Sequence, residues 1–237
     1  MKVEPLFYTI FSPLASRRFH WSDILGTTRF DRVHATLSFF VVKWEHDKPN
    51  EFTRVPMQSV ILIGYRGTGK TTVARNLAER LGIPVFDSDR EIECRAGKSI
   101  TDIFAQDGES VFRDWEETVI AEILASPNPL VLATGGGAIL RTKTRERLRQ
   151  AGYVIWLTAT PETILRRITS DAASQTMRPS LTSLPMHEEI VTILEQRQPL
   201  YAETAHEIID TDCRTIDEIV MGVAKKSLEN NCVDTIE

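Results

Sequence analysis

The chain has 237 residues, enough for one domain of ordinary size and an additional segment, and its composition of 42% hydrophobic and 26% charged residues is ordinary for a globular protein. A formal net charge of −5 gives no support to general nucleic-acid binding, and no apolar run approaches the roughly 20 residues of a membrane-spanning helix. The three cysteines are widely separated, so neither a disulfide framework nor a zinc site is indicated and a cytoplasmic location is expected.

Residues 1–56 differ in composition from the rest of the chain. They contain seven of the ten phenylalanines and carry a net charge of +2, against −7 for the remainder. Three interpretations are open: a small appendage, a mistaken translation start ahead of Met57, or a transit peptide that directs the protein to a plastid, because residues 1–22 hold a single acidic residue. We favour the first two, since the segment lacks the compact apolar stretch and small-residue cleavage site of a secretory signal.

A phosphate-binding motif, G-x-x-x-x-G-K-[ST], occupies residues 64–71. The β-branched apolar run Val60–Ile63 before it is typical of a buried parallel strand. After it, apolar residues recur at helical spacing as far as Leu81, and Gly82 ends the predicted helix. Strand, glycine loop and helix are the context that this motif requires, so we predict a nucleotide site here.

The residue types of this motif suit a triphosphate. Glycines let successive backbone N–H groups turn inward, and the following helix adds the positive end of its dipole. Lys70 supplies a compact cation for the β- and γ-phosphates, and the hydroxyl of Thr71 suits Mg²⁺. ATP with Mg²⁺ is therefore the expected cofactor.

From residue 57 onward, short apolar strands alternate with amphipathic helices, which predicts an α/β fold with a parallel sheet and helices on both of its faces. Further strands are expected at residues 85–86, 130–133, 154–157 and 208–209. Helices are expected at residues 92–96, 101–105, 109–124, 141–150, from Pro161, at 188–201 and at 215–228. We assign residues 57–229 to this domain and residues 230–237 to a frayed tail; residues 170–185 are polar and read as a loop.

Asp87-Ser88-Asp89 follows the second predicted strand. Ligands of open α/β sheets gather at the carboxyl ends of the strands, so these carboxylates are expected near the phosphate loop. One acid can hold Mg²⁺ and the other can accept a proton from an attacking hydroxyl. The alternative is a helix N-cap, and capping does not exclude a catalytic role.

Three further sets of residues have properties expected of a site for a small anion. Gly135-Gly136-Gly137 follows the third strand, where three glycines leave backbone N–H groups exposed and admit a ligand closely. Arg113 lies one helical turn before Glu116, either as an ordinary ion pair or as an oriented guanidinium for a carboxylate. Arg178 in the polar loop could stabilise a transferring phosphate, whereas Arg197 could simply be a cation at a helix C-terminus.

Together these pieces resemble the shikimate kinase family. The resemblance covers residues 57 to about 225 and rests on motifs in the family's order, namely Gly64–Thr72, Phe86-Asp87-Ser88-Asp89, Gly108-Glu109-x-x-Phe112-Arg113-x-x-Glu116, Leu132–Gly137, Arg178-Pro179 and Arg197-x-Pro199-Leu200-Tyr201. One departure is Ser180, where the family commonly has leucine. Residues 1–56 have no counterpart that we recognise.

The resemblance implies a three-layer P-loop fold of the nucleoside-monophosphate-kinase type, with five parallel strands and a mobile flap. It implies transfer of the ATP γ-phosphate to the 3-hydroxyl of shikimate, a step of aromatic amino-acid biosynthesis, by a kinase that we expect to be a monomer. Catalytic roles are implied for Lys70, Asp89 and Arg178. Mg²⁺ would be held by Thr71 and Asp87. The implied nucleotide contacts are Gly64, Gly67, Thr68, Gly69, Lys70, Thr71, Thr72 and Arg178. The implied shikimate contacts are Asp89, Arg113, Gly135, Gly136, Gly137 and Arg197.

Two alternatives remain at the level of the sequence. Another small-molecule kinase of the same fold, such as one for gluconate, would also bind a carboxylate and hydroxyls. A nucleotide-binding regulatory module without catalysis is disfavoured, because it would have no need for both acids and a flap arginine. Adenine contacts are expected near Asp210–Arg214 and around Arg166, although no motif defines them.

Overall fold

The computed structural model of the chain describes residues 58–170 and 184–233. The N-terminal segment 1–56, the loop around Arg178 and the end of the predicted tail, residues 234–237, lie outside the described residues. Contacts between residues divide the chain into residues 1–47 and 48–237, and the described residues all belong to the second unit.

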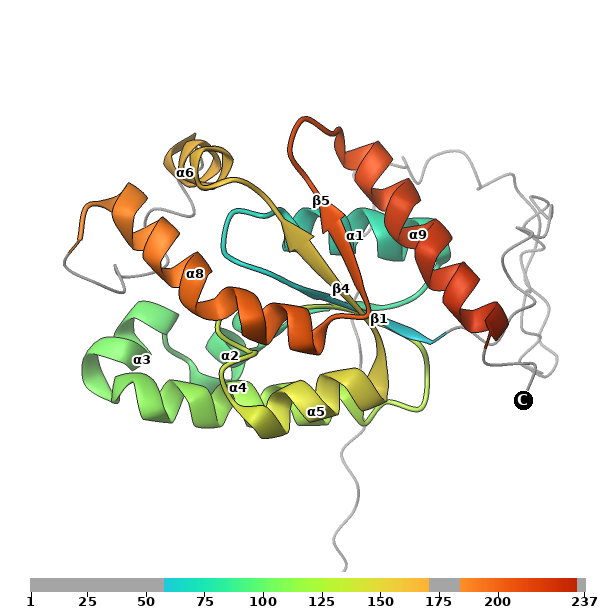
Figure 1. The fold of residues 1–237 in the computed structure, drawn as a ribbon. Helices are drawn as coiled ribbons and strands as arrows, with labels where there is room; N and C mark the ends of the chain where they lie inside the picture. The colour runs from blue at the N-terminus through green and yellow to red at the C-terminus, as the bar shows by residue number, and fades with distance from the viewer. Residues whose placement is uncertain (1–57, 171–183, 234–237) are drawn as a thin grey trace, which may run out of the picture. The chain divides into compact units, whose positions relative to one another are not determined.

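Five parallel strands form one sheet in the order β2-β3-β1-β4-β5, as predicted for an α/β fold (Figure 1). The strands are β1 Ser59–Ile63, β2 Val85–Asp87, β3 Val131–Ala133, β4 Gly152–Thr158 and β5 Glu207–Asp210. In the register, Leu62 of β1 lies opposite Ala133 of β3 and Ile155 of β4. The strand that leads into the phosphate loop is therefore central, and its loop lies beside the ends of its neighbours.

Helices cover both faces of the sheet because successive side chains of each buried strand point to opposite faces. One face packs against α1 Lys70–Leu81 and α9 Ile216–Val233, and Val60 and Leu62 of β1 belong to that core. The other face, which includes Ile61 and Ile63, packs against helices α2 Ser88–Ala96, α3 Ile100–Gln106, α4 Gly108–Leu124, α5 Thr142–Ala151 and α8 Met186–Thr204. Figure 1 shows α4 and α5 side by side along this second face.

Helix boundaries agree with the local signals of the sequence. Gly82 ends α1 in the left-handed conformation at φ 67°, and its N–H donates to the carbonyl of Ala78. The side chain of Ser99 caps α3 by accepting a hydrogen bond from the N–H of Asp102 at 3.0 Å. Helix α6, Pro161–Ser170, begins with proline, and the hydroxyl of Thr160 accepts from the N–H of Thr163 at 3.3 Å.

Helix α8 is longer than the sequence predicts, and one interpretation of Arg197 is wrong as a result. The helix continues to Thr204 with Pro199 in its interior, so Arg197 is not a cation at the helix C-terminus. Tertiary contacts hold the last turns: Tyr201 bonds the glycine loop, and Arg149 of α5 donates to three carbonyls, those of residues 203–205. These anchors outweigh the lost N–H of the proline.

A third apolar cluster joins the phosphate loop to two helices. The ring of Tyr65, within the loop, packs with Ile164 and Ile168 of α6 and with Ile190 and Ile193 of α8. Figure 1 shows α6 lying beside the first turns of α8. The phosphate loop is thus packed against both helices through one buried aromatic side chain.

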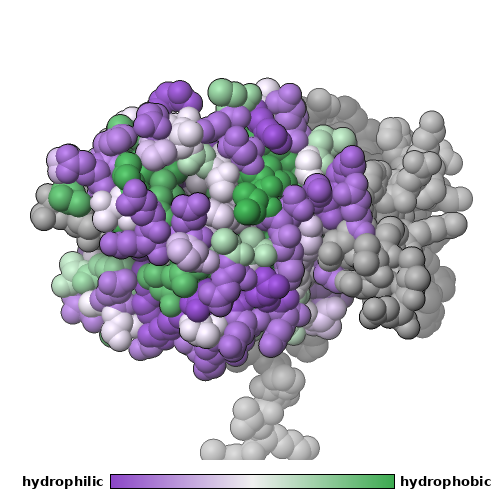
Figure 2. Space-filling view, viewed as in Figure 1, coloured by the Kyte–Doolittle hydropathy of each residue, from purple (hydrophilic) through white to green (hydrophobic). Residues whose placement is uncertain are grey.

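The surface drawn in Figure 2 is largely hydrophilic, with hydrophobic residues in small separate groups. Among the described residues, exposed large apolar side chains include Val85 and Phe86 on one edge strand and Ile208 on the other. Scattered apolar side chains of this kind are usual at protein surfaces. Within residues 58–170 and 184–233, no helix is both long enough and apolar enough to cross a membrane.

Candidate active site

The phosphate loop follows β1 and has the strained backbone that its glycines allow. Gly64 and Gly69 have φ angles of 140° and 91°, a region that other residues rarely adopt. A side chain at Gly64 would also overlap the carbonyl oxygen of Leu157 on β4. The loop then enters α1, whose first residue is Lys70.

Lys70 lies inside this loop. Its ammonium donates to the carbonyl oxygens of Gly64 at 2.7 Å and Tyr65 at 2.8 Å, and the residue is 7% exposed. The hydroxyl of Thr68 donates to the same Tyr65 carbonyl at 2.8 Å. A phosphate bound at Lys70 would compete for the ammonium with these carbonyls, one of which belongs to Tyr65.

Asp87 caps a helix and also contacts the phosphate-loop helix α1. Its Oδ1 accepts from the N–H groups of Asp89 and Arg90 and so caps α2, while its Oδ2 accepts from the hydroxyl of Thr71 at 2.7 Å. The cap explains why the chain turns into a helix here. The second contact brings together the two residues predicted to hold Mg²⁺.

The glycine triplet after β3 makes room for neighbouring groups. A Cβ at Gly135 would lie 2.5 Å from Oδ1 of Asp89 and 2.8 Å from Oε1 of Glu116. One at Gly136 would lie 3.4 Å from the backbone nitrogen of Arg66 and 3.6 Å from the carbonyl oxygen of Gly64. One at Gly137 would overlap the guanidinium of Arg113.

A side chain on the triplet would therefore meet the acid Asp89, the phosphate loop and the Arg113 cation in turn. The prediction that it leaves its backbone N–H groups exposed is wrong for Gly135, whose N–H donates to the hydroxyl of Ser88 at 2.9 Å. No φ of the three residues lies in the left-handed region. Glycine is needed here for space, because acidic and basic side chains converge on the loop from α2 and α4.

The predicted pair of Arg113 and Glu116 is present and buried. Nη1 of Arg113 donates to Oε2 of Glu116 at 2.6 Å, and Nη2 donates to Oε1 of Glu109 at 3.1 Å. Burial raises the pKa of the Glu116 carboxyl, and the neighbouring Arg113 opposes that shift. Two carboxylates on one helix thus fix the orientation of the guanidinium.

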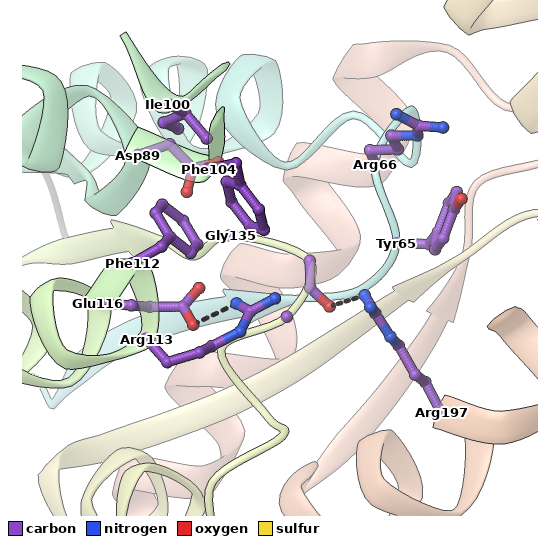
Figure 3. A pocket seen from close by; sticks show the side chains of 12 residues that line it. Tyr65, Arg66, Asp89, Ile100, Phe104, Phe112, Arg113, Glu116, Gly135 and Arg197 are labelled. Carbon is purple, nitrogen blue, oxygen red and sulfur yellow. Dashed lines mark hydrogen bonds and ion pairs between the residues drawn. The ribbon is translucent and has the colours of Figure 1, made fainter. Parts of the chain in front are cut away.

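Arg197 approaches the same loop from α8. Its Nη1 donates to the carbonyl oxygen of Gly136 at 3.0 Å, and the hydroxyl of Tyr201 donates to that oxygen at 2.6 Å. Burial raises the pKa of Tyr201, so its hydroxyl stays a donor. Figure 3 shows the guanidinium groups of Arg113 and Arg197 converging on the glycine loop from opposite sides.

These side chains line one pocket. Its wall is formed by Tyr65, Arg66, Asp89, Ile100, Phe104, Phe112, Arg113, Glu116, Gly135, Gly136, Gly137 and Arg197. The lining residues include three arginines, two acids, three aromatic residues and an isoleucine (Figure 3). Such a mixture suits a small anion that has hydroxyl groups and an apolar ring face.

Comparison with known proteins agrees with this geometry. The family model for shikimate kinase matches residues 66–227. The chain belongs to the shikimate kinase family. A shikimate kinase of Symbiobacterium thermophilum is 43% identical over 171 residues, which cover 72% of this chain and 97% of that protein. One of Enterococcus faecalis is 39% identical and is covered completely, over 73% of this chain.

A solved structure gives the same result. The shikimate kinase from Acinetobacter baumannii, determined in complex with shikimate, matches with a TM-score of 0.68 and 38% identity, covering 73% of this chain and 94% of that one. The predicted family, the P-loop fold and the kinase activity on shikimate are thereby confirmed. The shikimate kinase family uses ATP and Mg²⁺.

Several residues that line this pocket were not predicted from the sequence. Tyr65 and Arg66 occupy free positions of the phosphate-loop motif, which carries no information about them. Ile100 and Phe104 lie one turn apart on α3, where an apolar face is equally typical of core packing. The ring centroids of Phe104 and Phe112 lie 4.7 Å apart with the rings tilted by 38°, a contact that only the fold creates.

Two further predicted regions are the loop of Arg178 and the surroundings of the adenine. Arg178 lies outside the described residues, so its role stays a prediction. Near the predicted adenine region, Arg167 rather than Arg166 connects the phosphate loop to the end of β5, because it donates to Gly67 O at 3.3 Å and to Thr211 O at 2.8 Å. The N–H of Thr160 donates to Asp212 at 2.9 Å in the same loop cluster.

Proposed function

We propose that the pocket binds shikimate beside the phosphate loop, and that the chain transfers the γ-phosphoryl group of ATP to the 3-hydroxyl. The observation that carries this proposal is the glycine triplet, where a Cβ on each of three consecutive residues would meet in turn Asp89, the carbonyl of Gly64 and the guanidinium of Arg113. A phosphate donor and an acidic acceptor bound at these groups would share one loop. Proximity of this kind removes much of the entropic cost of a two-substrate reaction.

On the nucleotide side, the phosphates would lie in the loop formed by Gly64, Gly67, Thr68 and Gly69. Lys70 would move from the loop carbonyls to the β- and γ-phosphates, and the first turn of α1, with Thr71 and Thr72, would add its N–H groups. The helix dipole and the lysine charge then stabilise the charge of the transferring group.

Thr71 and Asp87 fit a magnesium site. Both offer hard oxygen atoms, their side chains lie 2.7 Å apart, and Mg²⁺ bound with nucleotide needs few protein ligands because water and phosphate oxygens supply the rest. Among the described residues there is no group of three or more His, Cys, Asp or Glu side chains that could hold a metal, which agrees with such a sparse site. When bound, the ion neutralises charge on the phosphates.

On the acceptor side, Arg113 and Arg197 would hold the carboxylate of shikimate, and the backbone of residues 135–137 would border its ring. Asp89 would orient the 3-hydroxyl and accept its proton as the hydroxyl oxygen bonds to the γ-phosphorus and the bond to the bridging oxygen of ADP breaks. Asp89 is 8% exposed, which suits a proton acceptor screened from water. Arg178 remains the proposed cation for the transition state.

A coupled assay with ATP, Mg²⁺ and a panel of sugar acids and cyclitol acids tests this proposal. We expect turnover of shikimate, and Arg113→Ala should raise its KM about 10-fold to 150-fold, the equivalent of about 1.5–3 kcal/mol for a lost charge-assisted contact. Turnover of gluconate without shikimate would reject the substrate. Tight ATP binding without any turnover would favour a regulatory module.

The organisation of the chain is part of the proposal. Residues 57–229 would form the kinase domain, because the family model matches residues 66–227 and the chain covers 97% and 100% of two relatives. We further propose a cytoplasmic monomer without nucleic-acid or membrane partners, with a plastid location if residues 1–56 act as a transit peptide. Intact-mass measurement of protein from its native source tests the start at Met57, and a mass that matches residues 1–237 would reject it.

A further inference from the structure

Arg66 connects the phosphate loop to α8 through a buried ion pair. Its Nη2 donates to Oε1 of Glu189 at 2.8 Å, and the two side chains are 14% and 1% exposed. Exposed ion pairs contribute little, but a pair removed from water constrains its partners because separating them leaves a charge unpaired. The loop and the helix are therefore expected to move together.

Helix α8 also carries a residue of the substrate pocket. Arg197 follows Glu189 by eight residues on the same helix, about 12 Å along its axis at 1.5 Å per residue. A helix transmits displacement as a rigid element over such a distance. A shift of Glu189 would therefore alter the position of Arg197 against the carbonyl of Gly136.

The neighbouring residue provides the link to the nucleotide. Tyr65 offers its backbone carbonyl to Lys70 and to Thr68, while its ring packs against Ile190 and other apolar residues of α6 and α8. The guanidinium of Arg66 lies 5.8 Å from the centre of that ring. Residues 65 and 66 thus contact the phosphate site through their backbone and α8 through their side chains.

We propose that Arg66 is a positioning residue that couples nucleotide binding to the substrate pocket through its ion pair with Glu189. The inference rests on the proposed function. A phosphate that draws Lys70 away from the Tyr65 carbonyl changes the loop, the ion pair passes that change to α8, and Arg197 takes a position that favours the substrate carboxylate. Each ligand then strengthens the binding of the other by the same factor, as linkage requires.

The coupling is measured as a ratio of affinities. Isothermal titration calorimetry gives the Kd of shikimate for the full chain with and without saturating Mg-ADP. We expect Mg-ADP to lower that Kd by about 5-fold or more, within the usual range of coupling between sites. In Arg66→Met and in Glu189→Gln the ratio of the two Kd values should fall below about 2-fold. In Glu189→Gln, which keeps the arginine in the pocket wall, the Kd without nucleotide should change less than about 3-fold.

A double variant of Arg66 and Glu189 still tests the proposal if one of the single variants folds poorly. Arg66→Met with Glu189→Gln removes both charges and leaves neither unpaired. If the ion pair carries the coupling, the double variant loses the same factor as either single variant and no more. Arg95→Met is the matched control, because Arg95 also bonds a glutamate, Glu91, at 2.8 Å but on the surface of α2. It should retain the wild-type ratio.

The outcomes separate this inference from the proposed function. A wild-type chain that does not phosphorylate shikimate rejects the function, and the inference with it. Only the coupling role of Arg66 is overturned if the wild type is active but Mg-ADP does not change its Kd for shikimate. The same holds if the double variant keeps the wild-type ratio of the two Kd values. A large loss of affinity in Arg66→Met with an unchanged ratio would instead make Arg66 a direct substrate contact and also overturn it.

Discussion

Gly137→Ala should impair substrate binding by displacing Arg113. The added Cβ would lie 2.5 Å from Nη2 and 2.6 Å from Cζ of the guanidinium, whereas ordinary van der Waals contact begins near 3.4 Å. The guanidinium cannot rotate away freely, because Glu116 and Glu109 hold it at 2.6 and 3.1 Å. Relief of the overlap therefore requires Cζ to retreat by about 0.8 Å from its present position.

The size of the effect follows from this displacement. Misplacing a substrate-binding group by about 1 Å can cost about 100-fold in rate. Loss of one hydrogen bond to a charged group costs about 1.5–3 kcal/mol, or about 10-fold to 150-fold in affinity. We therefore expect the KM for shikimate to rise about 10-fold to 100-fold. The KM for ATP should change by less than about 2-fold, because the groups that Gly137 contacts lie outside the phosphate loop.

Steady-state kinetics in a coupled assay measures both constants. Gly222→Ala is the control, because a Cβ there meets nothing within 4 Å and the residue lies inside α9. That change should leave both KM values unaltered and stabilise the helix by about 0.5–1 kcal/mol. Gly137→Ala combined with Arg113→Ala separates steric displacement from general damage, since the alanine at 113 removes the clash.

Two outcomes would contradict the displacement of Arg113 by Gly137→Ala. The double variant should be no worse than Arg113→Ala alone, because both changes act on the same contact. An unchanged KM for shikimate in Gly137→Ala, with the thermal midpoint also unchanged, would show that the loop absorbs the extra atom and that glycine is not required there for space. Equal losses of affinity for both substrates would indicate a distorted loop instead of a displaced arginine.

Three further predictions test the acid, a cap and a titration. Asp89→Asn should lower kcat about 100-fold to 10,000-fold while ATP affinity, measured by calorimetry, survives; near-normal kcat would remove Asp89 from the mechanism. Ser99→Ala should lower the free energy of unfolding in urea by about 1 kcal/mol, since the cap of α3 is lost. Hydrogen bonds from Thr215 hold the pKa of Glu218 below its usual 4.5, so this carboxylate stabilises the fold above that pH and loses its effect as pH falls through the lowered pKa. The loss of thermal stability in Glu218→Gln should therefore be larger at pH 7 than at pH 3.5, and a pH-independent loss would contradict the assignment.

Much of the fold follows from local patterns. The run Val60–Ile63, the left-handed Gly82 and the caps at Ser99 and Thr160 each depend on residues a few positions apart. Periodicity and capping act over single turns and strands, so one sequence contains the whole signal. The same applies to the phosphate loop, whose spacing is itself the chemical requirement.

Contacts between distant segments could not be predicted from the sequence, because the fold creates them. Arg66 and Glu189 are separated by 123 residues and bear no motif, yet they form one buried pair. The glycine triplet was expected to expose its backbone N–H groups to a ligand, but the order β2-β3-β1 brings Asp89 and the phosphate loop against it from either side. The helix predicted over residues 188–201 continues to Thr204 as part of α8, where the Tyr201 hydroxyl and other tertiary anchors hold its last turns. Burial and charge pairing arise only when strands and helices pack. The sequence therefore predicted which residues belong to the site, whereas the tertiary structure alone decided which groups surround them and hold them in place.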